Sequence, residues 1–199
     1  TGSDPVSFFG LLDEKEKPGN GSTMIIYNRE RGEFYLEQKS RGYPVETERG
    51  KIALVGGVIE EGENSYEAAV REINEEIEDD AAKSIILEAL KDNGRFYRRV
   101  PESANGITVY NYVRIIEIDS ERDWSVVTSS ENEGIKRVLK LEDVINLNPN
   151  YFAFSHGEVL KEFAMEECSR RTSQPLIKHF NPMLLTSYRT SYSGLNMQN

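Results

Sequence analysis

Clustered and alternating apolar positions predict two β-hairpins in this chain. Residues 22–28 (STMIIYN) and 32–39 (GEFYLEQK) are rich in β-branched and aromatic residues and flank a short charged turn, a pattern typical of a hairpin. The run 106–118 (GITVYNYVRIIEI) forms a second, longer hairpin with the residues GRFYRRV that precede it. The apolar stretch KIALVGG predicts a short strand ending on two glycines, and SIILEAL, residues 84–90, is interpreted as a further strand.

Apolar residues at helical spacing predict the helices. After a cap at Asn64 or Ser65, five apolar residues recur every three or four positions: Tyr66, Ala69, Val70, Ile73 and Ile77. A short helix over LEDVINL follows a strand over IKRVLKL, and residues 156–171 form an amphipathic helix with an inward face of Val159, Leu160, Phe163 and Ala164. Antiparallel hairpins combined with a few helices predict an α/β layered sandwich with a mixed central β-sheet.

Composition is that of one globular domain. The chain has 199 residues, of which 38% are hydrophobic and 29% charged, and this supplies enough apolar surface for a sizeable core. We expect a domain over residues 1–172, with an N-terminal extension to about residue 21, and a C-terminal tail or added strand over 173–199. No apolar run approaches the roughly 18 residues of a membrane span, so we expect a cytoplasmic protein that does not bind membranes.

The charge restricts the class of partner. The formal net charge is −10, and affinity for a long nucleic acid comes mostly from clustered Lys and Arg, so we expect no such partner. A small anion bound through metal ions is compatible with this charge. The single cysteine, Cys168, excludes an internal disulfide. A homodimer is among the assemblies that the sequence leaves open.

An acidic cluster stands out in the helix after Asn64. Glu72, Glu75 and Glu76 occupy positions i, i+3 and i+4, so their carboxylates emerge on one face of the helix. Such carboxylates repel one another and raise each other's pKa unless a cation neutralises them. Oxygen ligands without a nearby His or Cys favour Mg²⁺ or Mn²⁺ over zinc. The pattern therefore indicates a divalent-cation site on this helix.

The same stretch resembles the signature of the Nudix hydrolases. That signature is a glycine, five residues, Glu, seven residues, Arg-Glu, an aliphatic residue, any residue, Glu-Glu, any residue, Gly and an aliphatic residue. The positions filled in register are Gly57, Glu63, Arg71, Glu72, Ile73, Glu75 and Glu76. Six fixed identities coincide by chance on the order of once in ten million start positions. The chain departs from the signature at two positions, where Glu78 replaces the glycine and Asp79 replaces the aliphatic residue. Without that glycine we expect the helix to run past Ile77 or to stop within residues 79–82.

The resemblance implies a Nudix-like α/β/α sandwich and assigns metal ligands. By the resemblance, Glu72 and Glu76 are the main ligands of Mg²⁺ or Mn²⁺, Glu75 serves a second ion or orients water, and the Gly57 carbonyl completes a coordination shell. It also implies that Arg71 and Glu63 brace the loop before the helix.

The general base stays open at this point. Glu76 lies within the signature, whereas Glu131 and Glu133 lie on a later loop, where many members of the family carry a further catalytic or metal-binding glutamate. Catalytic roles are therefore expected of Glu76, Glu75, Arg71 and Glu133.

The substrate is less constrained. Lys39 and Arg41 precede the variable loop and are candidates to bind substrate. Tyr97 falls near where dinucleoside polyphosphate hydrolases of the family carry a tyrosine, and core packing competes with that role. The resemblance implies a Mg²⁺- or Mn²⁺-dependent pyrophosphohydrolase acting on a small nucleotide, a nucleoside diphosphate linked to another moiety such as ADP-ribose or an ADP-sugar. Two alternatives remain, a dinucleoside polyphosphate hydrolase and a non-catalytic nucleotide-sensing module.

Overall fold

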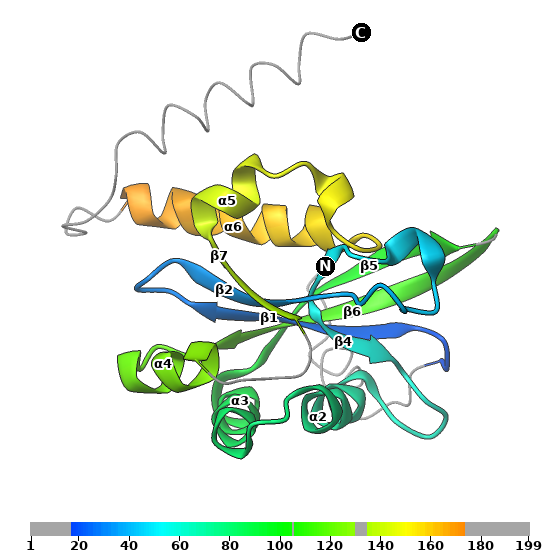
Figure 1. Ribbon diagram of the computed structural model, residues 1–199, viewed down its shortest axis with the longest axis horizontal. Helices are drawn as coiled ribbons and strands as arrows, with labels where there is room; N and C mark the ends of the chain where they lie inside the picture. Colours follow the sequence, from blue (N-terminus) through cyan, green and yellow to red (C-terminus); the bar gives the residue numbers. More distant parts are fainter. Residues whose placement is uncertain (1–16, 105, 130–134, 174–199) are drawn as a thin grey trace, which may run out of the picture.

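A mixed β-sheet covered by helices on both faces forms the protein (Figure 1). The computed structural model describes residues 17–104, 106–129 and 135–173. Within these ranges the sheet has seven strands: β1 (Gly21–Asn28), β2 (Glu33–Gln38), β3 (Ile52–Ala53), β4 (Val55–Val58), β5 (Arg95–Ala104), β6 (Ile107–Glu117) and β7 (Ile135–Lys140). The predicted α/β sandwich is therefore confirmed.

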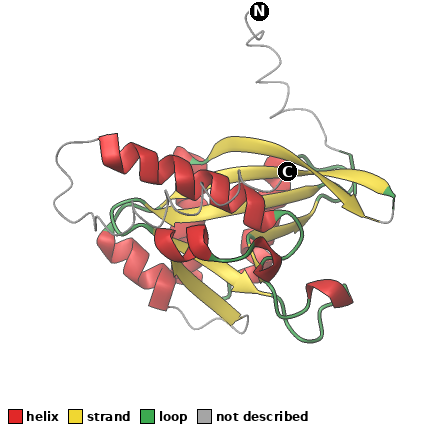
Figure 2. Cartoon of the chain, turned by 90° about the horizontal axis from the view of Figure 1, so that it is seen from above, coloured by secondary structure: helices red, strands yellow, loops and turns green. Residues whose placement is uncertain are grey.

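The helices form two layers. On one face lie α2 (Ser65–Glu76), α3 (Asp80–Asn93) and α4 (Glu121–Ser129), and on the other lie α5 (Leu141–Asn146) and α6 (His156–Ser173) (Figure 1). Two short 3₁₀ helices, η1 (Glu46–Glu48) and η2 (Pro149–Tyr151), lie in the connections. The view from above shows the helices lying over the strands (Figure 2). None of the helices in the described part of the chain combines the length and apolar character needed to cross a bilayer.

The central strand β1 organises the sheet. It pairs antiparallel with β2 and with β4, and parallel with β6, while β2 also pairs antiparallel with β3 and β7. The apolar stretch predicted as one strand is therefore two, because β3 joins β2 whereas β4 joins β1. At the break between them, the Leu54 N–H donates a hydrogen bond to Nδ1 of the buried His156, at 3.1 Å. The side chain satisfies a backbone group that the sheet leaves unpaired.

A separate hydrophobic core lies on each face. Phe34, Phe163 and Tyr27 belong to the core under α5 and α6, and Tyr27 and Phe34 stack with ring centroids 4.8 Å apart. Ile73 and Trp124 belong to the core on the α2 side. The predicted inward face of the last helix is confirmed by the burial of Val159, Leu160, Phe163 and Ala164.

Two predictions about the helices are wrong. Residues 84–90 are not a strand but part of α3, in which Ala82, Ile86 and Leu90 are buried at four-residue spacing. The helix α2 does not run past Ile77 but ends at Glu76, with Ile77 in an extended conformation. The reason is Asp79, whose carboxylate accepts the Ala82 N–H at 2.8 Å and caps α3. The helix α4 has no counterpart among the predicted elements.

Candidate active site

The helix α2 begins at a polar cap and places its apolar side against the sheet. The Asn64 side chain accepts the Glu67 N–H at 2.8 Å, which satisfies one of the free amides of the first turn. Ala69 and Ile73 are fully buried on the sheet side. Because these residues fix the rotation of the helix, the acidic residues of its last two turns are directed toward β4 and the loop that follows it.

Glu72 lies directly over the backbone of β4. Its side chain is buried, and a Cβ built on Gly57 would stand only 2.2 Å from Glu72 Oε1. Only glycine leaves room for the carboxylate there. Burial raises the pKa of Glu72, while the neighbouring Arg71 guanidinium opposes that shift. A carboxylate held at low exposure against a strand is thus part of the site.

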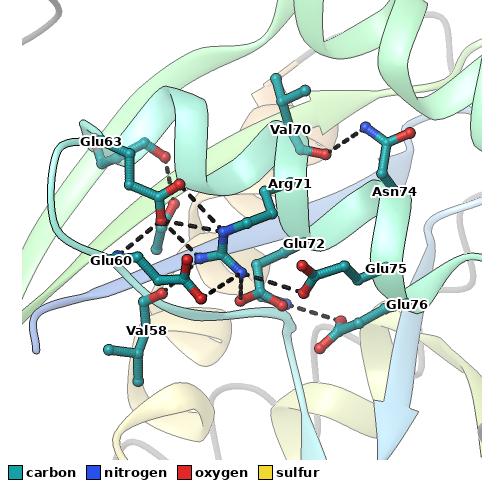
Figure 3. Close-up of polar contacts among 12 residues, drawn as sticks. Val58, Glu60, Glu63, Val70, Arg71, Glu72, Asn74, Glu75 and Glu76 are labelled. Atoms are coloured by element: carbon teal, nitrogen blue, oxygen red, sulfur yellow. Dashed lines mark hydrogen bonds and ion pairs between the residues drawn. The ribbon is translucent and has the colours of Figure 1, made fainter.

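Arg71 joins the acidic residues of the loop and the helix (Figure 3). Its Nη2 donates to Glu63 Oε1 at 2.7 Å and to the Val58 carbonyl at 2.8 Å. Its Nη1 donates to Glu72 Oε1 at 2.9 Å and to Glu75 Oε2 at 3.2 Å. Hydrogen bonding to Glu63 is the largest cause of the raised pKa of Arg71. The planar guanidinium therefore fixes the loop before α2 relative to its carboxylates.

Glu76 faces the other glycine of β4. The Gly56 N–H donates to Glu76 Oε2 at 3.3 Å. Burial, followed by the carboxylates of Glu37 and Glu72, raises the pKa of Glu76 to about 9, and the Lys39 ammonium opposes that shift. Carboxylates close to one another at low exposure favour a bound cation, because the cation offsets their mutual repulsion. Glu75, by contrast, has an exposed side chain held by Arg71.

Glu37 belongs to this site but is not among the residues expected from the sequence. It lies on β2, and its Oε1 accepts a hydrogen bond from Lys39 Nζ at 2.9 Å. Strand alternation puts Glu37 on the same face as Tyr35, which packs in the core of the α2 side. That alternation is the sequence signal for its direction. The proximity of β2 to the end of α2 is a tertiary contact that no local pattern contains.

The three candidate substrate residues lie in different places. Lys39 is close enough to Glu76 for the two charges to interact. Arg41 lies in an exposed turn after β2. Tyr97 is buried in the core of the α5–α6 side, where its ring meets Phe163 edge-on at 5.6 Å. The structure brings only Lys39 together with the carboxylates. Glu133, like Glu131, lies outside the described residues.

The donor set fits Mg²⁺ or Mn²⁺, although it is not preassembled. Glu72 and Glu76 supply carboxylate oxygens next to the glycines of β4, where a Cβ at Gly57 would occupy the space. Across the described part of the chain, no three carboxylate, His or Cys side chains converge into a ready-made metal centre. Arg71 draws Glu72 and Glu75 toward itself, so ion binding would need a shift of these side chains.

Comparison with solved structures places the fold among Nudix proteins. A mutT/nudix family protein from Listeria innocua is 19% identical (80% of this chain, 100% of that chain, TM-score 0.49). The MutT protein from Methanosarcina mazei Go1 is 17% identical (81% and 100%, TM-score 0.50). NrtR from Shewanella oneidensis, in complex with a 27mer DNA, is 16% identical (88% and 82%, TM-score 0.52). No curated protein matches the chain.

The family follows from the sequence match together with the geometry. The family model described as NUDIX domain matches residues 17–163, which include every strand of the sheet, the loop held by Arg71 and the acidic helix. With the glycine, arginine and glutamates of the signature in contact in the folded protein, the chain belongs to the NUDIX family.

Proposed function

We propose that this Nudix hydrolase is a Mg²⁺- or Mn²⁺-dependent pyrophosphohydrolase that cleaves a nucleoside diphosphate linked to another moiety, with ADP-ribose or an ADP-sugar as the favoured substrate. The observation that carries the proposal is the pair Glu72 and Glu76, both directed at the β4 glycines and both with raised pKa values. Such a pair in oxygen-only surroundings suits a hard divalent cation.

Each residue has a definite task in this reaction. Glu72 and Glu76 would hold the ion, with Glu75 beside them on the exposed side of the helix. Bound Mg²⁺ supplies a polarised phosphate and a water of lowered pKa. Glu76 lies at the β4 glycines beside the ion site, so its carboxylate, ionised once the ion is bound, would be within reach of the proton of the attacking water. Arg71 keeps Glu72 and the Glu63 loop in register.

Lys39 gives the site a positive charge for the substrate. Its ammonium is mostly buried beside Glu37, on the Glu76 side of β2. A pyrophosphate carries several negative charges, and the ions need not neutralise all of them. A lysine at this position can donate a charge-assisted hydrogen bond to a phosphate oxygen. Because Arg41 is exposed and Tyr97 is in the opposite core, Lys39 is the strongest candidate for substrate binding among the three.

Hydrolysis is favoured over nucleotide sensing. A sensing module has no need to keep all the acids of the signature, whereas here Glu63, Glu72 and Glu75 all contact Arg71 and Glu76 contacts β4. The net charge of −10 also speaks against a DNA partner, even though NrtR, which shares the fold, is seen with a 27mer DNA.

A hydrolysis screen tests the proposal. The pure protein is incubated with Mg²⁺ or Mn²⁺ and ADP-ribose, nucleotide sugars, dinucleoside polyphosphates or nucleoside triphosphates, and the products are separated by chromatography. We expect cleavage of the linked nucleoside diphosphates and loss of turnover by about 100-fold or more in Glu76→Gln, which removes one ligand charge. Glu88→Gln, at an exposed position of α3, is the matched control. Full activity of Glu76→Gln would contradict the assignment.

A further inference from the structure

Glu37 lies on the sheet close to Glu76, near the end of the acidic helix. Glu37 is on β2, two residues beyond Tyr35, on the face that packs toward α2. Its side chain is 21% exposed and that of Lys39 is 12% exposed, and Oε1 and Nζ are 2.9 Å apart. A partly buried ion pair of this geometry is stronger than one on the surface, because water screens it less.

Both the backbone and the ammonium of Lys39 have defined contacts. Its N–H donates to the Lys51 carbonyl at 2.8 Å, and its carbonyl accepts the Gly50 N–H at 3.0 Å, so its backbone closes the loop between β2 and β3. Its Nζ lies 4.8 Å from the centroid of the Tyr43 ring. Among the contacts of the ammonium, Glu37 supplies the hydrogen bond, at 2.9 Å, and so directs one of its N–H groups.

The N–H groups of Arg71 and Lys39 differ in how many of them the protein itself already binds. Arg71 directs its guanidinium at Glu63, Glu72, Glu75 and the Val58 carbonyl. An ammonium has three N–H donors, and within the described ranges the hydrogen-bond acceptor of Lys39 is Glu37. Two donors of Lys39 therefore remain for a ligand next to Glu76, whereas the guanidinium of Arg71 is engaged by the protein itself.

We propose that Glu37 is a positioning residue for substrate binding: it holds the Lys39 ammonium beside Glu76 so that the remaining N–H groups donate to a phosphate oxygen of the pyrophosphate. The inference rests on the proposed function of this site and adds a residue outside the Nudix signature. Glu37 acts through Lys39 and does not touch the substrate. Its removal should weaken binding and leave the chemical step nearly unchanged.

A double-mutant cycle on the Michaelis constant tests the proposal. Glu37→Gln, Lys39→Met and the double variant are compared with wild type, using ADP-ribose and saturating Mg²⁺. We expect each single variant to raise KM about fivefold to tenfold with kcat within about twofold, and Glu37→Gln to add nothing in the Lys39→Met background. Glu37→Asp, which keeps the charge, should recover part of the loss.

The control is the other ion pair of the same loop. Glu48 and Lys51 are 3.2 Å apart, and Glu48 also accepts the Phe154 N–H at 3.1 Å, a bond that the amide oxygen of glutamine can keep. Glu48→Gln therefore removes an ion pair outside the site, and its KM should stay within about twofold of wild type. An equal rise in KM on adding Glu37→Gln to wild type and to Lys39→Met would overturn the proposal. So would a fall in kcat of about 100-fold at unchanged KM, which would make Glu37 a ligand of the ion.

A binding measurement distinguishes a failure of the positioning role of Glu37 from a failure of the hydrolase function. If the wild-type protein hydrolyses none of the phosphoanhydrides, the proposed hydrolase function fails, and the same cycle is measured on the dissociation constant of ADP with Mg²⁺ by calorimetry. Non-additive losses of affinity at Glu37 and Lys39 would still support the positioning role. Equal affinities in all four proteins, or no binding of ADP by the wild type, would overturn it.

Discussion

Glu72 occupies the space that any side chain at position 57 would need. A Cβ on Gly57 would stand 2.2 Å from Glu72 Oε1 and 2.6 Å from its Cδ. The glycine is thus required by a side chain on another element, in addition to any conformational demand of its own backbone. Strand β4 and helix α2 therefore approach closely where the Glu72 carboxylate lies.

Gly57→Ala should displace Glu72 and lower turnover. The methyl group forces the carboxylate out of its place, because contacts under 3.0 Å do not occur between a real Cβ and an oxygen. We expect kcat to fall by about tenfold or more, as for a displaced catalytic group, with a smaller effect on stability. Steady-state kinetics and a melting curve provide the measurement. Gly42→Ala, whose Cβ would meet only Ser40 Oγ at 4.0 Å, is the control, and equal kinetics for both variants would contradict the prediction.

Arg71→Lys should impair activity although it keeps the charge. The guanidinium contacts Glu63, Glu72 and Glu75 at once, and an ammonium cannot reproduce that planar fork. We expect kcat to fall about tenfold because Glu72 and the Glu63 loop lose their common partner. Arg137→Lys, at an exposed arginine bonded to Gln38, is the matched control. Wild-type kcat in Arg71→Lys would show that charge alone is sufficient.

The sequence predicts the glutamates of helix α2, but it does not predict Glu37, which β2 brings to the site. Spacing along one helix is enough to put Glu72, Glu75 and Glu76 on one side, because the geometry of an α-helix is local. Glu37 reaches the same place through β2, and the pairing that brings it there depends on contacts between distant segments.

The errors in secondary structure have local causes. Adjacent isoleucines at 85 and 86 favour a strand, yet a four-residue burial pattern and the Asp79 cap make this segment α3. The end of α2 was expected to depend on the missing glycine at position 78. It depends on the start of the next helix, because a capping aspartate at position 79 needs an extended backbone.

Asp79→Ala should destabilise the protein without changing the chemistry. Its carboxylate caps α3 through the Ala82 N–H at 2.8 Å, and loss of such a cap costs about 1 kcal/mol of the free energy of unfolding. Chemical unfolding measures the loss, and kcat should stay within about twofold of wild type. Asp80→Ala, at an exposed neighbouring aspartate in the first turn, should cost less. A large fall in kcat for Asp79→Ala would mean that this residue acts in the site.

The buried His156 should make stability fall in acid. Its Nδ1 accepts the Leu54 N–H, so the neutral ring is required in the folded state. Burial, with a further contribution from the Lys39 charge, lowers its pKa from 6.5 to about 3. The unfolded state therefore binds a proton below about pH 6.5, whereas the folded state binds it only near pH 3. The contribution of His156 to the free energy of unfolding is highest above pH 6.5 and decreases progressively as the pH falls from 6.5 toward 3.

The size of this effect can be measured with one variant. Between about pH 7.5 and about pH 5, the shifted histidine alone should remove about 2 kcal/mol of the free energy of unfolding. In His156→Asn an amide oxygen can still accept the Leu54 N–H but nothing titrates, so this part of the loss should disappear even if the variant is less stable at both pH values. Urea unfolding of the two proteins at both pH values gives the comparison, in which His179 is common to both and cancels. Equal losses in the two proteins would show that His156 is protonated as readily in the folded state as in the unfolded one.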